Sequence, residues 1–429
     1  MKVEVIRKQW PVGQGCFSSA SIMVDNQAFE YIYDCGSQNL GALRTCLDAY
    51  SPNSHRVDAL FISHLDSDHV NGLDYLLGTT DLNIDSIFLP YLTNKDIILI
   101  VGHALSEGAF SGNLLEFVSN PSEWLTDRGA KNIFYIRRQP EEGSEFNEGD
   151  ISEPPPFKEK VNLTKPDKTH SRLLIVANEQ PSMTSDKLGS SIGAKTLSSD
   201  TVIGAVSSVG LIWVLLPYVP PMPELAIAHF FNEVEKQGFP VDNDELLTSE
   251  LIDALRDPNR RSRLRESYSH LANDHNYVSL CLYSGPSRQN GLSEGFIKRF
   301  TQIPHSFHHF YRTHLNRGTA DGNGAGWLGT GDAKLKSSQD IKNLTWRYRH
   351  YLREIGVLMA PHHGSHRNFS VKVLDNIIPR MVFASAGSNN SYGHPHTRVV
   401  DQVTARGHQF HIVSEDPQTI LVERLDFQV

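Results

Sequence analysis

The chain is poor in cysteine and lacks any long apolar run. Its four cysteines show no paired spacing, which argues against both a disulfide framework and a cysteine-rich zinc site. No segment approaches the roughly 18 apolar residues that a membrane span requires. Charged side chains at Lys2 and Glu4 stand where a signal peptide would have its apolar core. The sequence therefore predicts a cytoplasmic protein that does not enter a membrane.

Positive charge is also scarce, since 40 lysines and arginines against 49 aspartates and glutamates leave a formal net charge of -9. This balance argues against a surface coated for nucleic-acid binding, although it leaves room for a local basic groove. The chain also lacks the Gly-x-Ser-x-Gly elbow of serine hydrolases and the Gly-x-x-x-x-Gly-Lys-Ser/Thr loop that binds nucleotide phosphates. Neither a serine nucleophile of that kind nor such a phosphate loop is indicated.

Histidine, in contrast, is abundant, with 20 residues. Four potential metal ligands, His64, Asp66, Asp68 and His69, follow the apolar segment 57–62, which predicts a buried strand. The apolar spacing after them is typical of a helix. Four such groups in one strand-to-helix loop would repel one another and lose hydration unless a cation lay among them. Imidazole and carboxylate are ligands of borderline divalent metals. The alternative is a polar surface loop.

The spacing His-x-Asp-x-Asp-His resembles the His-x-His-x-Asp-His signature of metallo-β-lactamase-fold hydrolases, with Asp66 in place of the second histidine. The turn Val12-Gly-Gln-Gly15 and the strand that ends in Asp34-Cys-Gly36 resemble one branch of that fold, the domain attached to bacterial DNA-uptake (competence) channels. The resemblance implies an α/β protein, an αββα sandwich with large insertions. It also implies that Asp34 supports the metal ligands from behind, the alternative being a turn residue at a strand end.

A hydrolytic site with two cations needs ligands for each and a group that bridges them. The resemblance implies that His64 and Asp66 hold the first cation. It implies that Asp68, which is also a catalytic candidate, and His69 hold the second. Asp332, at the end of an apolar strand, matches the bridging aspartate, and its alternative is a turn.

The last ligand is expected from the pair His362–His363, and His362 is favoured because it directly follows a predicted strand. The place of the third histidine of the usual set falls near Asn276, which is expected to have a supporting role; His275 is the alternative ligand there. The first cation would then be weakly held and surrounded by oxygen. Because harder ligands favour manganese or magnesium over zinc, we expect two divalent cations, manganese or zinc.

The loop Tyr392-Gly-His-Pro-His396 also resembles the DNA-uptake branch. His394 is the predicted catalytic histidine, placed to contact a phosphate or to protonate a leaving oxygen. The candidates for substrate binding are His363, Ser365, Asn390 and His396.

The expected organisation alternates a common core with insertions. Residues 1–90 and 327–429 are predicted to form its two halves. Between them the sequence predicts an insertion with connecting strands at 91–210, a return to the core at 211–284 with a helical insertion at 221–272, and a further insertion at 285–326. Residues 97–105 fit either a helix or a strand, and residues 334–354 fit a charged helix.

These features predict a metal-dependent hydrolase, foremost a phosphodiesterase or nuclease acting on DNA or a nucleotide substrate. Two alternatives remain open. The same cations can serve hydrolysis of a small ester, lactone, lactam or thioester, because the fold permits many chemistries. The chain can also be a metal-binding subunit that docks a protein partner through its insertions, as in a multiprotein defence system.

Overall fold

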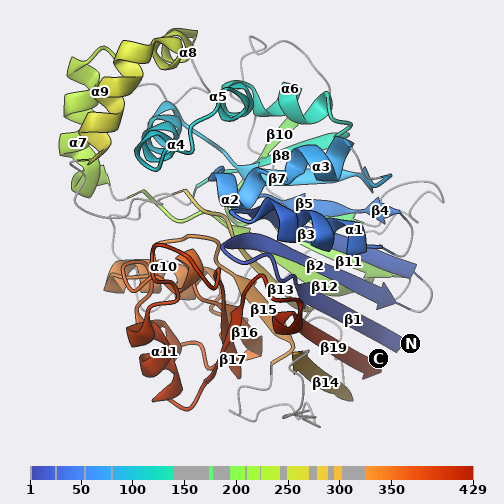
Figure 1. The fold of residues 1–429 in the computed structure, drawn as a ribbon. Coiled ribbons are helices and arrows are strands. Elements are labelled where there is room, and N and C mark those ends of the chain that lie inside the picture. Colours follow the sequence, from blue (N-terminus) through green and yellow to red (C-terminus); the bar gives the residue numbers. More distant parts are fainter. Residues whose placement is uncertain are drawn as a thin grey trace, which may run out of the picture.

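The computed structural model describes residues 2–24, 27–52, 55–78, 81–138, 173–176, 194–207, 210–222, 224–241, 249–269, 278–287, 294–301 and 324–428. In these parts the chain is a mixed α/β protein built around two large sheets (Figure 1). Asn276 and the alternative ligand His275 lie outside the described residues, as do residues 139–170 of the predicted insertion 91–210.

The first sheet joins a parallel half to an antiparallel half. Its nine described strands are, in spatial order, β10 (Ala194–Leu197), β8 (Asn132–Ile136), β7 (Ser86–Pro90), β5 (Ala59–Phe61), β3 (Gln27–Ser37), β2 (Gly15–Val24), β1 (Lys2–Gln9), β19 (Leu421–Gln428) and β14 (Glu294–Thr301). Pairing is parallel from β10 to β3 and antiparallel from β3 to β14. A small separate sheet pairs β4 (Arg56–Val57) with β6 (Asn83–Ile84).

The second sheet has the same composite plan. Its eight described strands are, in spatial order, β18 (Gln409–Val413), β17 (Met381–Ser385), β16 (Ile355–Met359), β15 (Gly326–Gly329), β13 (Cys281–Pro286), β12 (Gly210–Tyr218), β11 (Val202–Ser207) and β9 (Leu173–Val176). Pairing is parallel from β18 to β15 and antiparallel from β15 to β9.

The alternation of side chains along the strands separates the apolar interior into layers, because neighbouring residues of a strand point to opposite faces. In β3, Tyr31 and Tyr33 belong to the cluster between the two sheets, whereas Ile32 belongs to the cluster under the helices of the first sheet. In β16, Val357 lies in the central cluster and Leu358 under the helices of the second sheet. The layers therefore follow the order helices, sheet, sheet, helices.

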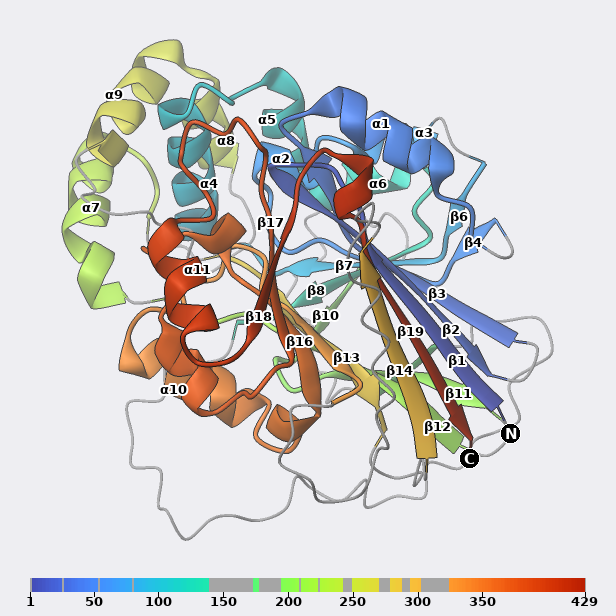
Figure 2. The same ribbon diagram turned by 60° about the horizontal axis from the view of Figure 1, so that its bottom comes forward.

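Helices cover the outer face of each sheet (Figures 1 and 2). On the side of the first sheet these are α1 (Leu40–Ala49), α2 (Ser67–Val70), α3 (Leu73–Gly78), α4 (Asn94–Ser106), α5 (Gly112–Ser119), α6 (Pro121–Thr126), α7 (Glu224–Lys236), α8 (Ser249–Arg256) and α9 (Pro258–Ser269). On the second sheet lie α10 (Ser338–Arg347) and α11 (Thr397–Thr404). Short 3-10 turns occur at Leu352–Glu354, His362–Gly364, Val371–Asp375 and Pro417–Thr419.

The three helices α7, α8 and α9 enter the chain between β12 and β13, which are neighbours in the second sheet. They do not cover that sheet but pack with α4, and Figure 1 shows the group beside the first sheet. We call α4 together with α7–α9 the helical layer.

The loops that follow the parallel strands bring the predicted site together. His64 follows β5, Asp332 follows β15, and the pair His362–His363 follows β16. Carboxyl ends of parallel strands lie at one edge of a sheet, and ligands bind there in open α/β sheets. The two parallel halves therefore supply the candidate site from both sheets.

The structure decides one open alternative, shortens one predicted helix and contains a strand within one predicted insertion. Residues 97–105 are helical within α4, because its capping box at Thr93 and Asp96 favours a helix start. The predicted helix 334–354 is confined to α10, which begins at its own N-cap, Ser337. Part of the predicted insertion 285–326 forms β14, which extends the first sheet beside β19.

Candidate metal centre

The loop of residues 64–69, which we call the metal loop, is held close to the backbone of β3. Its last residues start α2, for which Asp66 is the N-cap. A Cβ atom built at Gly36 would lie 2.5 Å from backbone atoms of Asp68 and His69. Since real Cβ atoms do not approach backbone so closely, only glycine allows this packing.

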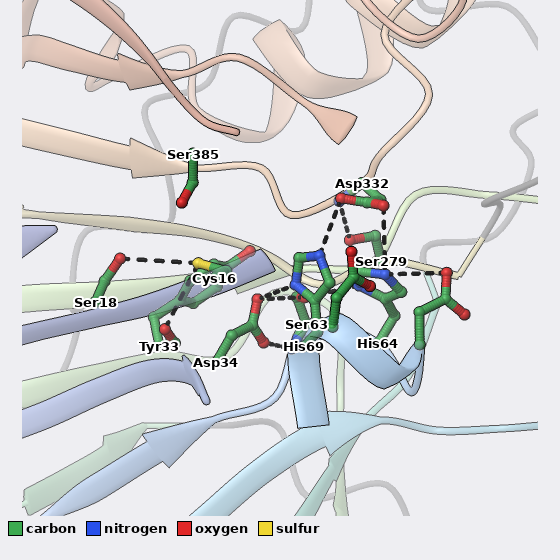
Figure 3. A network of polar contacts seen from close by, with 12 residues as sticks. Cys16, Ser18, Tyr33, Asp34, Ser63, His64, His69, Ser279, Asp332 and Ser385 are labelled. Atoms are coloured by element: carbon green, nitrogen blue, oxygen red, sulfur yellow. Dashed lines mark hydrogen bonds and ion pairs between the residues drawn. The ribbon is translucent and has the colours of Figure 1, made fainter. Parts of the chain in front are cut away.

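Asp34, for which the resemblance implied a supporting role, holds the metal loop through hydrogen bonds to Ser63 and a contact with His69. It adopts φ +58°, a left-handed conformation that is uncommon outside glycine. One carboxylate oxygen accepts the Ser63 backbone N–H at 2.6 Å, and the other accepts the Ser63 hydroxyl at 2.6 Å. His69 Nδ1 lies 2.8 Å from that second oxygen (Figure 3). This contact turns His69 Nε2 away from Asp34 and towards Asp332.

Asp332 lies between the imidazoles of the metal loop. It follows Gly331, whose φ is +49°, and its backbone N–H donates to the Ser279 hydroxyl at 3.0 Å. Asp332 Oδ1 is 3.3 Å from His69 Nε2, and Oδ2 is 3.6 Å from His64 Nε2 (Figure 3). One carboxylate thus offers a separate oxygen to each histidine, as a bridging ligand must.

The histidine pair after β16 points to both sides of Asp332. His362 and His363 have φ values of +49° and +55°, a conformation that costs energy for residues other than glycine. His363 Nδ1 lies 2.8 Å from the Ser385 carbonyl, and its Nε2 lies 3.3 Å from Asp68 Oδ2. His362 Nε2 lies 3.6 Å from Asp332 Oδ2. The structure therefore favours His363 over the expected His362 as partner of Asp68, because His363 faces Asp68 and its ring is oriented by a carbonyl.

Two ligand groups result, and both contain His69. Ligand atoms of His64, His69 and Asp332 lie within 4.8 Å of one another, as do those of Asp68, His69 and His363. The Nε2 atoms of His64, His69 and His363 are buried and have no hydrogen-bond partner among the described residues. Buried imidazole nitrogens directed at carboxylates without a hydrogen bond fit a cation between them. The residues present therefore fit a metal site, as the sequence predicted at this coarse level.

A third group, Cys16, Asp34 and His69, fits less well. Burial and the charge of Asp34 raise the pKa of the Cys16 thiol well above its usual value. A thiol ligates metal as the thiolate, which this environment disfavours. Asp34 is also engaged by Ser63 and His69. We therefore assign this group to support rather than to metal binding.

The carboxylates make the centre strongly attractive to positive charge. Burial and His69 would lower the pKa of His64, yet Asp332 and Asp66 raise it to about 9. Burial would raise the pKa of Asp332, but the surrounding imidazoles, His362 and His69 foremost, hold it well below its usual value. The same field that favours protons here favours divalent cations, which compete for the same atoms.

One histidine of the centre has no counterpart in the sequence prediction. His103, from the last turn of α4, places its Nε2 3.4 Å from Asp66 Oδ2. Asp66 Oδ2 also lies 3.4 Å from His64 Nε2. Burial would raise the pKa of Asp66, whereas His103 and His64 lower it. A lone histidine on an apolar helix carries no local signature, so sequence reasoning could not have placed it.

The metal centre opens into a cleft with a volume of about 870 Å³. Asp66, Asp68, His362 and His394 line it, together with residues of the helical layer such as Tyr268. The helical layer therefore forms one wall, and the loops after β16 and β17 form the opposite one.

The remaining candidates lie along the second wall. Ser365, His394 and His396 line the cleft. Asn390 instead holds the loop, because its Nδ2 donates to the His394 carbonyl at 2.6 Å and its Oδ1 accepts the His394 N–H at 2.8 Å. The structure thus places Asn390 against the His394 backbone and outside the cleft lining. Burial and the nearby His362 lower the pKa of His394 to about 3, so its imidazole is neutral at pH 7.

Both acidic and basic residues line the cleft. Glu107 accepts a hydrogen bond from the Tyr392 hydroxyl at 2.7 Å. The rings of His366 and His396 lie 4.1 Å apart, and Arg367 follows His366 in the same lining. Burial and the nearby charges of Lys336, Arg367 and Arg398 lower the pKa of His366. We call these five residues, Lys336, His366, Arg367, His396 and Arg398, the basic cluster.

Comparison with known proteins gives one local similarity. No family model matches the chain. Over 77 residues it is 31% identical to ComE operon protein 3 of Bacillus subtilis (strain 168), a match that covers 18% of this chain and 9% of that protein. Within the parts that the structure describes, no helix combines the length and apolar character needed to traverse a bilayer.

Proposed function

We propose that the chain is a metal-dependent hydrolase with a metallo-β-lactamase-type αββα fold that cleaves phosphodiester bonds in nucleic acid. The observation that carries the proposal is Asp332, whose two oxygens face separate pairs of imidazoles: His69 and His363 at Oδ1, and His64 and His362 at Oδ2. The layer order, the strand ends that supply the ligands and the local similarity to ComE operon protein 3 support the assignment of the fold.

Asp68, His69 and His363 would hold one cation, on the side of Asp332 Oδ1. His64 and Asp66 would hold the other, on the side of Oδ2. When bound, two such cations lower the pKa of water towards neutrality and neutralise charge on the attacked group. The nitrogen and oxygen donors suit zinc or manganese.

The chain's own residues orient and confine the reaction. Asp34 and the Ser385 carbonyl fix the rings of His69 and His363, which keeps Nε2 of each directed at the centre. His394 is neutral at pH 7 and is held by Asn390, so it would donate an N–H to a phosphoryl oxygen rather than act as an acid. Its Nδ1 is buried and without a hydrogen-bond partner among the described residues.

The basic cluster supports a polymer of phosphates over a small neutral ester. A phosphodiester placed at the cations would leave the neighbouring phosphate of the same strand near Arg367, which is exposed at the cleft wall. Phosphate contacts by arginine and lysine supply most of the sequence-independent affinity for nucleic acid. A small lactam or thioester would make no use of these charges.

The test is hydrolysis of a single-stranded oligodeoxynucleotide, of bis(p-nitrophenyl) phosphate and of a p-nitrophenyl ester, each with manganese, zinc or magnesium. We expect cleavage of both phosphodiesters, and a loss of at least about 100-fold in Asp68→Ala, since even residues behind metal ligands contribute 10–100-fold. Asp401→Ala, an exposed aspartate of α11, is the matched control and should retain full activity.

Two outcomes would overturn the proposal. Intact phosphodiesters with every metal would remove the phosphodiesterase assignment. If only the ester is hydrolysed and Asp68→Ala loses this activity, the same centre would instead serve hydrolysis of small esters.

A further inference from the structure

The two cation positions differ in how the core supplies their ligands. Around Asp332 Oδ1, Asp68 and His69 come from the metal loop and His363 from the loop after β16. On the side of Asp332 Oδ2, the metal loop supplies His64 and Asp66. Asp66 extends outwards from that side, away from the second cation position and towards the helical layer.

An imidazole of the helical layer meets Asp66 there. His103 Nε2 and His64 Nε2 each lie 3.4 Å from the same oxygen of Asp66. Two ligand atoms bound to one metal at about 2.0–2.2 Å in tetrahedral geometry lie about 3.4 Å apart, and each imidazole lies at that distance from Asp66. The ligand atoms of His64, Asp66 and His103 do not all lie within 4.8 Å of one another, so one imidazole would move towards the other when a cation binds all three. The His103 side chain is 20% exposed and lines the cleft, so a cation can reach it from solvent.

Packing within the helical layer fixes the position of His103. Gly102 lies against the Tyr268 ring of α9, where an added Cβ would come within 2.8 Å of the ring. The His103 and Tyr268 rings lie 5.8 Å apart. On the other faces of α4, Ile98 and Val101 are fully buried. The contact between α9 and α4 therefore directs His103 at the metal loop.

We infer that His103 is a ligand of the first cation, so that this cation joins the helical layer to the core. The inference rests on the proposed metal-dependent function. With His103, the first position gains a second imidazole and becomes a mixed set of His64, Asp66, His103 and one oxygen of Asp332. That set would differ from the oxygen-rich first site expected from the sequence, and it would suit zinc as well as manganese.

A cation bound in this way would also have a structural role, because it would connect two parts of the cleft. His103 and Tyr268 line the same wall of the cleft, and Asp66 belongs to its floor. A cation held by His64 and His103 together would tie this wall to the strand end at β5. The width of the cleft would then depend on whether the first cation is bound.

The experiment measures metal content and affinity rather than turnover. Protein stripped with a chelator is titrated with zinc or manganese by calorimetry, and the bound metal is counted by elemental analysis after desalting. We expect two cations per chain in the wild type. In His103→Ala and in the more size-conserving His103→Gln, one of the two should bind at least about 100-fold more weakly, because loss of a ligand exceeds the 10–100-fold effect of partners behind it. His229→Ala, an exposed histidine of α7 in the same layer, should bind both.

The outcomes separate the two proposals. A wild type that binds no cation would defeat the proposed function. A wild type with two cations and unchanged affinities in both His103 variants would overturn the role of His103 alone. The same result together with loss of one cation in His362→Ala would assign that place to His362, which faces the same oxygen of Asp332 as His64 does. Unfolding curves in chelator identify any variant that fails to fold.

Discussion

At the scale of single residues, the centre depends on backbone atoms that approach one another more closely than side chains would permit. Gly36 lets β3 pass directly beneath Asp68 and His69. Asp34, two residues earlier, adopts a left-handed conformation and accepts hydrogen bonds from Ser63. The strained backbone of Asp34 is compensated by these hydrogen bonds, which fix the position of the metal loop.

Gly36→Ala should therefore displace the metal loop. The added methyl group would overlap backbone atoms at 2.5 Å, and such overpacking costs about 1–3 kcal/mol of unfolding free energy. We expect a lower denaturant midpoint and weaker binding of the second cation, measured by calorimetry. Gly78→Ala is the control, because an added Cβ there meets no atom within 4 Å. Equal metal affinities in the two variants would contradict this account of Gly36.

Some residues of the candidate site can be predicted from the residues next to them in the sequence, and others cannot. The metal loop could be predicted because four ligand types occur within six residues after an apolar strand. Asp332 could be predicted because it also ends such a strand. The sequence could not predict which of His362 and His363 faces Asp68. This depends on their left-handed backbone and on the Ser385 carbonyl, which comes from a different strand.

At the scale of elements, a buried ion pair within the first sheet includes an arginine whose hydrogen bonds reach the second sheet. Arg7 of β1 lies 3.0 Å from Glu423 of β19, and both side chains are almost fully buried. The guanidinium also donates to the carbonyls of Ser284, in β13, at 3.1 Å and of Ala325 at 2.8 Å. The first sheet is thereby joined to the second through a single side chain.

Arg7→Ala should destabilise the protein by about 3–5 kcal/mol, because it leaves the charge of Glu423 buried without its main partner. The measurement is the unfolding free energy from urea titration. Arg424→Ala provides the comparison: Arg424 lies beside Glu423 in sequence and pairs with Glu4 at 3.4 Å in an exposed position, where a loss of about 0–1 kcal/mol is expected. Similar losses in both variants would argue against a special role for Arg7.

Helices and strands could be predicted where the pattern of apolar residues was strong. They could not be predicted where contacts with distant parts of the chain determine the secondary structure. The buried strands β5, β7 and β16 are short apolar segments that the sequence indicates directly. The apolar residues of α4 fit helix or strand equally, and only the packing with α9 explains why both of its faces are buried. The position of strand β14 is determined by its pairing with β19, which lies 120 or more residues away in the sequence.

At the scale of the whole molecule, cations at this centre would link segments from both sheets and from the helical layer. Because such a site exists only in the folded chain, metal binding adds to folding stability. At a free metal concentration of 100 times the dissociation constant, each cation contributes about 2.7 kcal/mol. We expect a chelator to lower the melting temperature of the wild type and to leave that of Asp332→Asn nearly unchanged. Identical melting curves of the wild type with and without chelator would oppose a metal in the centre.

Asp332 has a consequence for the order in which the cations enter. With two cations bound as proposed, its single negative charge would serve both positions, one oxygen for each. The first ion to arrive neutralises part of the field that attracts the other, and the two like charges then repel across a short distance. Loading should therefore be anticooperative, with one tight step and one looser step. At low metal supply the protein would persist as a half-loaded species, and its activity would follow the ambient concentration of the ion.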